Sequence, residues 1–247
     1  MAPLLDEFEI HPLSGSLFSA GGHPVVFTNS ALLMLLAVMC ASLLMMVGMR
    51  RRALVPGRFQ MAAESIYNMI VDMVEGAAGK HAEPFVPFVF SIFVFILFCN
   101  VLGLIPYSFT VTSQIIVNFS LAIFLFIVII ITGFVRHGVR FFALFAPPAP
   151  KVMLPFMIVV EFLSFVVRPF SLSIRLFANM MAGHILLQVF AGMVASLLAA
   201  GWLSGFSVLP LLADVGITGF ELFVALLQAY IYAILSAVYL RDAIEMH

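Results

Sequence analysis

Two arginines, an asparagine, a histidine and a glutamine fall inside a stretch of this chain that is otherwise apolar enough to cross a membrane. The stretch, residues 168 to 188, reads RPFSLSIRLFANMMAGHILLQ, and a charge at the middle of a bilayer costs roughly 2.5 to 3.5 kcal/mol or more. On a helix, these side chains, one serine among them and one acid before them form two groups on nearly opposite sides. The first group shares one face and comprises Glu161, Arg168, Ser171, Arg175 and Asn179. The second group comprises His184 and Gln188.

A second polar stripe lies in the last apolar run of the chain. It comprises Glu221, Gln228, Tyr232 and Tyr239, which share one helical face, and we expect it to meet the first helix. Histidine titrates near neutrality, so a glutamate facing His184 would suit proton exchange. The alternative is a static buried pair that locks two helices together, and the residues alone leave both interpretations open.

Arg175 is suited to a different task. A guanidinium stays charged at any working pH and cannot relay protons, but it can stop positive charge from passing and can attract a carboxylate of a partner. Its place in the middle of an apolar run argues against snorkelling to an interface, and structural pairing with Glu161 remains an alternative. Arg168 and Glu161 are candidates for lining an aqueous access path or for structural pairing.

The composition predicts the class of protein. Of the 247 residues, 64% are hydrophobic and only 9% are charged, which predicts an all-α integral membrane protein. A net charge of −1 without a basic face argues against nucleic acid as a partner. Cys40 and Cys99 lie in separate apolar runs without metal-ligand spacing, so both are expected to be small buried hydrophobes. No metal or cofactor site is predicted.

One membrane domain with about five membrane helices is expected. Its parts are an outer N-terminal tail (1–28), a first span (29–49), an amphipathic segment on the cytoplasmic side (56–83), second and third spans (84–135) and a long tilted helical hairpin (155–240). As one helix, residues 156–200 would be on the order of 65 Å long, about twice the hydrocarbon thickness of a bilayer. A single tilted helix is expected there, because two spans would leave Arg241 on the wrong side.

Basic residues predict the orientation. With five spans and the N-terminus outside, nine of the 11 Lys and Arg residues fall in cytoplasmic segments and none falls in an outer segment. The nine are Arg50, Arg51, Arg52, Arg58, Lys80, Arg136, Arg140, Lys151 and Arg241. The acidic N-terminus lacks the basic region of a signal peptide and is expected to be mature chain. We therefore expect a periplasmic N-terminus and a cytoplasmic C-terminus.

Three runs of the chain resemble one family. They are NVLGLIPYSFT at 100–110, SLSIRLFANMMAGH at 171–184 and FELFVALLQAYIYAILSAVYL at 220–240, and they look like subunit a of the membrane sector of F-type ATP synthases. The resemblance implies a stator subunit in a bacterial inner membrane, packed against a rotating ring of c-subunits and joined by peripheral-stalk b-type subunits. It also implies two offset aqueous half-channels that load and unload a carboxylate on each ring subunit.

The resemblance further implies roles for individual residues. Arg175 matches the family's essential arginine, which would separate the two half-channels. The positions that match the outer half-channel are Asn179, His184, Glu221 and Gln228, and those that match the inner side are Ser171 and Glu161. Some bacterial members carry glutamate on the long helix and histidine on the last helix at this pair of positions. This chain instead has His184 and Glu221, and that arrangement resembles mitochondrial and related bacterial forms. The order of proton transfer within this pair stays open.

The chain is not expected to be catalytic on its own, because it has no GxxxxGK[ST] loop to bind ATP phosphates. One alternative function is a proton-coupled secondary transporter, which would predict internal repeats with paired broken helices. The sequence holds no second copy of the segment around Arg175. Another alternative is a membrane scaffold whose buried polar groups only stabilise helix packing.

Overall fold

The computed structural model describes residues 10–20, 23–49, 57–105, 108–138, 141, 153–201 and 204–244. In that part of the chain, five helices are long and apolar enough to cross a membrane, by length and composition. The expectation of an all-α membrane fold with about five spans is therefore confirmed. Several features named above lie outside the described residues, namely Arg50 to Arg52, Arg140, Lys151 and the first nine residues of the tail.

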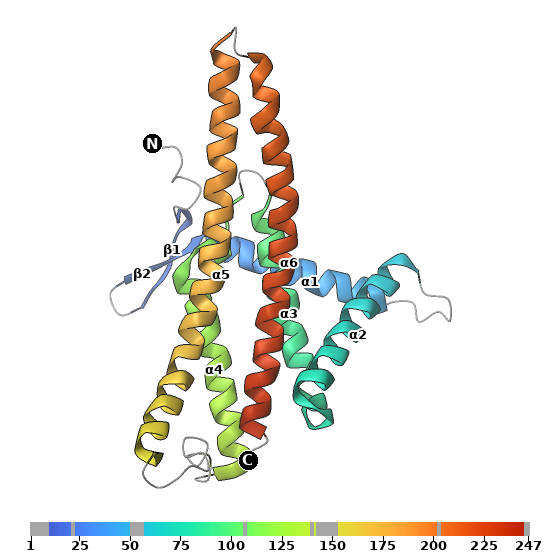
Figure 1. Cartoon of the computed structure of the whole chain (residues 1–247), viewed down its shortest axis with the longest axis vertical. Helices are drawn as coiled ribbons and strands as arrows, with labels where there is room; N and C mark the ends of the chain where they lie inside the picture. The colour runs from blue at the N-terminus through green and yellow to red at the C-terminus, as the bar shows by residue number, and fades with distance from the viewer. Residues whose placement is uncertain are drawn as a thin grey trace. The chain divides into compact units, whose positions relative to one another are not determined.

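The elements follow the chain in a simple order (Figure 1). They are β1 (Pro12–Ala20), β2 (His23–Thr28), α1 (Asn29–Met49), α2 (Arg58–Ala78), the 3-10 helix η3 (Lys80–Phe85), α3 (Val86–Gly103), η4 (Val111–Ser113), α4 (Ile115–His137), α5 (Leu154–Ala199), η6 (Ser204–Ser207) and α6 (Val208–Ile244). They form two compact units. Unit 1 comprises Met1–Ser42, Phe95–Gln114 and Leu176–Gln228, and unit 2 comprises Leu43–Val94, Ile115–Arg175 and Ala229–His247.

Unit 1 begins with a β-hairpin that the sequence analysis did not anticipate. Strands β1 and β2 pair antiparallel, with Ala20 opposite His23, in the segment that was expected to be only a tail. The hairpin leads directly into α1, where the Thr28 hydroxyl accepts a hydrogen bond from the Ala31 amide at 3.3 Å, as an N-capping residue does. The Asn29 amide also donates to the His11 carbonyl at 3.2 Å, which ties the start of α1 to the hairpin.

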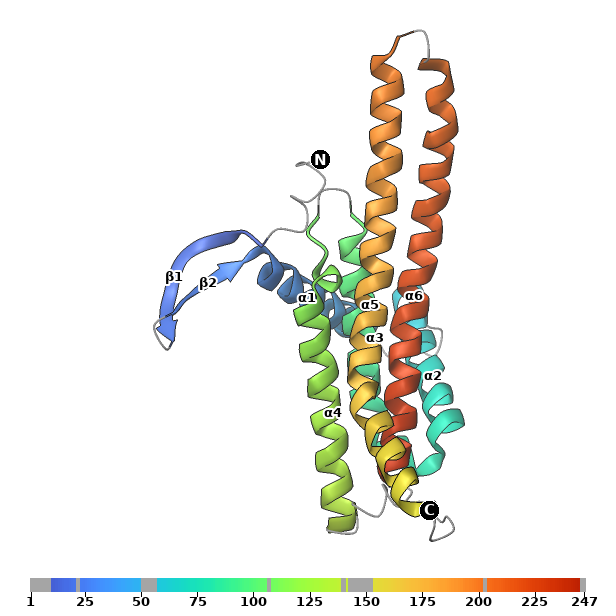
Figure 2. The same cartoon turned by 60° about the vertical axis from the view of Figure 1, so that its left-hand side comes forward.

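Unit 1 also contains a pair of antiparallel helix segments and a buried loop. The parts of α5 and α6 that belong to this unit, 176–199 and 208–228, lie side by side in both views (Figure 1, Figure 2). The short helix η4 is entirely buried although two of its three residues carry hydroxyls. Buried hydroxyls need hydrogen-bond partners where no water is available, so this loop is a place to look for polar contacts.

Unit 2 packs through aromatic side chains and one amphipathic helix. Helix α4 lies against the first part of α5, where the ring centroids of Phe119 and Phe170 are 5.0 Å apart and those of Phe126 and Phe165 are 4.6 Å apart. Helix α2 buries one face, formed by Ala63, Ile70, Met73, Val74 and Ala78, as its sequence pattern predicts. It ends at Gly79, whose φ of 70° lies in the left-handed region that glycine adopts at little cost.

Helix α5 is one continuous helix of 46 residues, about 69 Å long at 1.5 Å per residue. The sequence predicts one helix here rather than two spans, and the structure has one. Pro169 lies inside it, and a proline removes one backbone donor from a helix interior. The helix nevertheless continues on both sides, so the polar residues from Glu161 to Gln188 are all carried by a single element.

Candidate functional site

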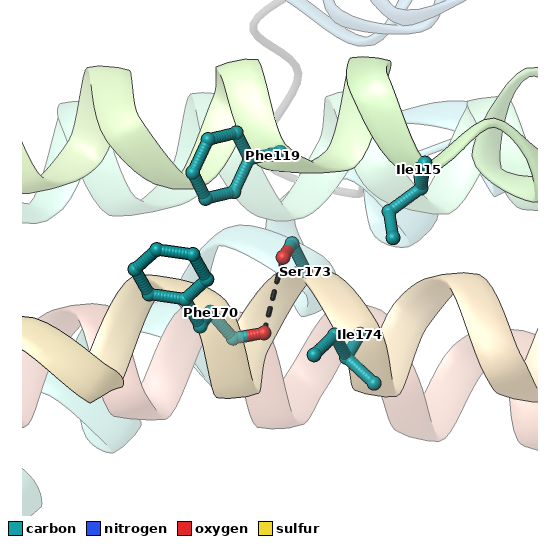
Figure 3. Close-up of a pocket in the computed structure, with 5 residues that line it drawn as sticks. All are labelled: Ile115, Phe119, Phe170, Ser173 and Ile174. Atoms are coloured by element: carbon teal, nitrogen blue, oxygen red, sulfur yellow. Dashed lines mark hydrogen bonds between the residues drawn. The ribbon is translucent and has the colours of Figure 1, made fainter.

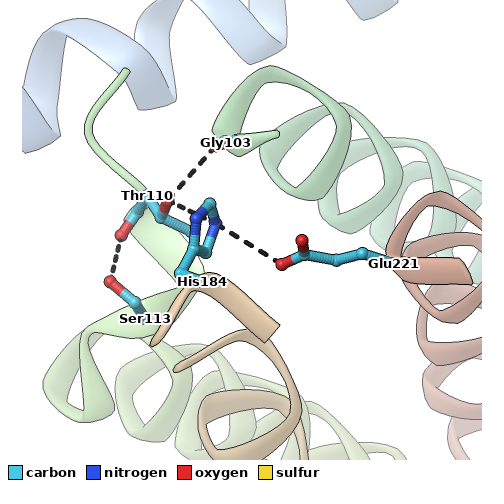
Figure 4. A network of polar contacts seen from close by, with 5 residues as sticks. All are labelled: Gly103, Thr110, Ser113, His184 and Glu221. Carbon is cyan, nitrogen blue, oxygen red and sulfur yellow. Dashed lines mark hydrogen bonds and ion pairs between the residues drawn. The ribbon is translucent and has the colours of Figure 1, made fainter. Parts of the chain in front are cut away.

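A histidine and a glutamate meet in the interior of unit 1 (Figure 4). His184 on α5 and Glu221 on α6 are 8% and 3% exposed, and His184 Nε2 lies 3.8 Å from Glu221 Oε1. The sequence placed these residues on stripes expected to meet, and the structure brings them together. The distance suits an ion pair but is too long for a direct hydrogen bond, so a proton can cross only after a closer approach or through a bridging water.

The Glu221 carboxylate rests against the backbone of α5. A Cβ atom at Gly183 would lie 2.5 Å from Glu221 Oε1 and 2.8 Å from its Cδ, closer than side chains tolerate. Neither Glu221 oxygen accepts a hydrogen bond from any described residue, although both are buried. The absence of a side chain at Gly183 therefore gives the carboxylate its place beside His184.

Thr110 is a third member of this cluster, and the sequence analysis missed it. Its Oγ1 lies 2.8 Å from His184 Nε2 and 3.3 Å from the Gly103 carbonyl oxygen (Figure 4). The Ser113 hydroxyl donates to the Thr110 carbonyl at 2.6 Å. Because 107–114 reads as an uncharged polar turn, only its unusual run of hydroxyl residues could have pointed to a buried role.

Three amide side chains lie elsewhere in unit 1. Asn100 on α3 is fully buried and donates from Nδ2 to the Ala225 carbonyl of α6 at 3.2 Å, which joins α3 to the helix that carries Glu221. Gln228 is also buried on α6, about two helical turns beyond Glu221. Asn179 is half-buried on α5. Of the predicted outer residues, only His184 and Glu221 form a contact described here.

A second charged cluster lies in unit 2 around Arg168. Its Nη1 donates to Asp242 Oδ2 at 3.1 Å, and its Nη2 lies 3.9 Å from Glu161 Oε1. The guanidinium also lies 4.7 Å from the ring centroid of Tyr239, close enough for a cation–π contact. The sequence is compatible with either an access path or structural pairing for Arg168 and Glu161, and nothing in it links Asp242 to them.

Arg175 differs from Arg168 in its surroundings. Its side chain is exposed, as are those of Ser171 and Ile174 nearby on α5. Among the ion pairs of the described residues, none includes Arg175. The pairing of Arg175 with Glu161, which the sequence left as an alternative, is therefore not formed: Glu161 has Arg168 as its neighbour.

An apolar pocket of about 280 Å³ also lies in unit 2, between α4 and α5 (Figure 3). Its lining is formed by Ile115, Phe119, Phe170, Ser173 and Ile174. The polar side chain among them, Ser173, already donates to the Phe170 carbonyl at 3.0 Å. The donor of this hydroxyl is therefore already used, and the other four lining residues are apolar. Across the described part of the chain, no three His, Cys, Asp or Glu side chains gather as a metal site requires.

Comparisons with known proteins place the chain in a family. The family described as ATP synthase A chain matches residues 30–241. The ATP synthase subunit a of a Methylobacterium species is 50% identical over 249 residues, covering 99% of each chain. The corresponding protein of Pelagibacter ubique is 44% identical over 245 residues, covering 98% of each chain. That of Parvibaculum lavamentivorans is 46% identical over 245 residues, covering 98% of this chain and 93% of the relative. With matches of this extent, the chain belongs to the ATP synthase subunit a family.

Proposed function

We propose that this chain is the proton-conducting stator subunit that couples proton flow to rotation of a c-subunit ring. Membership of the family makes it a proton-translocating subunit of the membrane sector of an F-type ATP synthase. The finer proposal is that two offset half-channels load and unload the ring carboxylates, with Arg175 between them. The chain contributes the proton path, and ATP is made or hydrolysed by other subunits of the complex.

The exposed Arg175 is the observation that carries this proposal. Its permanent charge projects from an apolar helix that is long enough to cross the membrane, and lipid tails would leave that charge unsolvated. A partner with a carboxylate inside the membrane would compensate it. A ring whose carboxylates pass one at a time provides such a group, and a fixed cation would also keep protons from crossing directly between the two paths.

The remaining polar residues divide between the two access paths. We assign Asn179, His184, Glu221 and Gln228 to the outer path, because the buried His184–Glu221 pair joins two groups that can each hold and release a proton. We assign Glu161 and Ser171 to the inner path. Both are accessible on α5, and Glu161 keeps a carboxylate available at 3.9 Å from Arg168.

The proposal includes partners and an orientation. The exposed face around Arg175 would contact the c-ring, and peripheral-stalk b-type subunits would contact the same chain elsewhere. As a multi-pass subunit of a bacterial synthase, it would lie in the inner membrane with its N-terminus periplasmic and its C-terminus cytoplasmic. The order of segments would then be an outer N-terminal part, a first span, a cytoplasmic-side helix, two spans and the tilted hairpin of 155–240.

Replacing Arg175 tests the central point. Complexes carrying Arg175→Ala would be reconstituted in vesicles, and ATP-driven acidification would be compared with the native complex and with Arg58→Ala. Arg58 is another exposed arginine, at the start of α2 outside the long apolar helices. We expect Arg175→Ala to retain the c-ring in a pull-down but to lose proton pumping, while Arg58→Ala pumps normally. Assembly with normal pumping by Arg175→Ala would make this arginine structural and refute the mechanism.

A further inference from the structure

We propose that Thr110 is a positioning residue that holds His184 Nε2 in both of its protonation states. The inference rests on the proposed function, in which His184 and Glu221 exchange protons. It adds a neutral hydroxyl that never carries net charge but responds each time the proton on the imidazole moves. The observation behind it is the short contact of 2.8 Å between Thr110 Oγ1 and His184 Nε2.

The position of Thr110 is set by groups other than His184. The residue is 2% exposed, and its methyl group packs against Gly103, where an added Cβ would come within 2.9 Å of Thr110 Cγ2. Its carbonyl accepts hydrogen bonds from both the hydroxyl and the amide of Ser113, at 2.6 and 3.3 Å. Contacts with Gly103 and Ser113 therefore hold Thr110 in place, independently of His184, with its hydroxyl facing the imidazole.

The two neighbours of the hydroxyl determine what it can do. A threonine hydroxyl has one proton to donate and two lone pairs that accept. The Gly103 carbonyl, 3.3 Å away, can only accept. When His184 carries a proton on Nε2, the hydroxyl can donate to Gly103 and accept from Nε2–H. When Nε2 has lost its proton, the hydroxyl can rotate and donate to the bare nitrogen.

This exchange matters because Nε2 is the nitrogen nearest to Glu221. The carboxylate is 3.8 Å away, too far to serve Nε2 as a direct hydrogen-bond partner. Without the hydroxyl, the buried Nε2 would lose its short hydrogen bond to Thr110 in each state, and the loss of a buried hydrogen bond is costly. Glu221 from α6 is the titratable group that faces this nitrogen, and the loop 108–114 contributes none. A group that both donates and accepts is thus needed, which serine supplies and valine does not.

Four variants of the intact complex, assayed by ATP-driven proton pumping in vesicles, test the proposal. Thr110→Val keeps the shape but removes the hydroxyl, and Thr110→Ser keeps the hydroxyl but removes the methyl group. Thr132→Val is the matched control, because the hydroxyl of Thr132 donates to Val128 within its own helix at 2.8 Å. His184→Gln reports on the proton path itself.

We expect Thr110→Val to pump about tenfold more slowly, as the loss of one buried hydrogen bond implies, while Thr110→Ser and Thr132→Val retain most of the native rate. If Thr110→Val does not assemble, Thr110→Ala replaces it in the comparison with Thr110→Ser. Equal losses of pumping rate in Thr110→Ser and in the variant without the hydroxyl would assign the effect to packing and overturn the proposal. Native pumping rates in both variants would also overturn it. Native pumping by His184→Gln would instead refute the proton path of the proposed function, and with it this role of Thr110.

Discussion

Adding one methyl group at Gly183 should disturb the proton path without disturbing the fold. In Gly183→Ala the new Cβ would lie 2.5 Å from Glu221 Oε1, whereas ordinary contacts begin at 3.4 Å. The carboxylate must therefore move by about 0.9 Å. The atoms that clash are at the far end of a flexible side chain, so we expect the helices to keep their packing and the complex to assemble.

The functional effect should be much larger than the structural one. A displacement of about 1 Å between reacting groups can lower a rate on the order of 10²-fold. The 3.8 Å between His184 and Glu221 already exceeds hydrogen-bond distance. We expect ATP-driven proton pumping by reconstituted Gly183→Ala complexes to fall by roughly tenfold or more. Gly192→Ala is the control, because a Cβ at Gly192 on the same helix has nothing within 4 Å.

The comparison of these two alanine variants decides the matter. Alanine is favoured over glycine in a helix interior by about 0.5–1 kcal/mol, so Gly192→Ala should be as stable as the native chain or slightly more so, and should pump normally. Equal pumping by assembled Gly183→Ala and Gly192→Ala complexes would refute the reasoning. It would mean that the carboxylate position seen here is not needed for proton transfer.

Three further predictions concern stability, each read as retention of the subunit in the complex on heating. Gly133→Ala should destabilise unit 2 by about 1–3 kcal/mol, because its Cβ would overlap the buried Phe141 ring; the smaller side chain of Phe141→Leu should relieve the loss. In a double-mutant cycle, Arg168→Gln and Asp242→Asn should show a coupling of about 0.2–1 kcal/mol, since both side chains are partly exposed, and strict additivity would contradict the pair. Asn100→Leu should cost about 1 kcal/mol through its lost bond to α6, and an unchanged melting profile would count against that contact.

The long apolar helices were readable from the sequence because membrane solvation leaves few alternatives. A run of apolar residues without turn signals must satisfy its backbone within itself, which is why residues 156–200 predict one helix and α5 is one. The approach of His184 to Glu221 was readable for a related reason. Polar groups on apolar helices face one another rather than lipid, so two stripes on neighbouring helices are expected to meet.

Other features left no periodic signal in the sequence. Thr110 belongs to a loop, where no helical or strand repeat shows which side chains turn inward, and its partner is 74 residues away. The Arg168–Asp242 contact has the same separation, and Asp242 appeared only to follow the last span. The strands β1 and β2 have no regular alternation of apolar and polar residues that would predict them, although the Gly-Gly pair between them is a known turn signal.

The continuity of α5 has a consequence for changes in chain length. Each residue added to or removed from a helix turns everything beyond it by about 100° and shifts it by about 1.5 Å. A single-residue deletion between Arg175 and His184 would thus change the angle between these two side chains around the helix axis by about 100°, although both residues would still be present. No loop intervenes to absorb the change. The apolar residues between Arg175 and Gly183 should accept many substitutions of similar size, yet the segment should tolerate no insertion or deletion, so its length is itself part of the functional design.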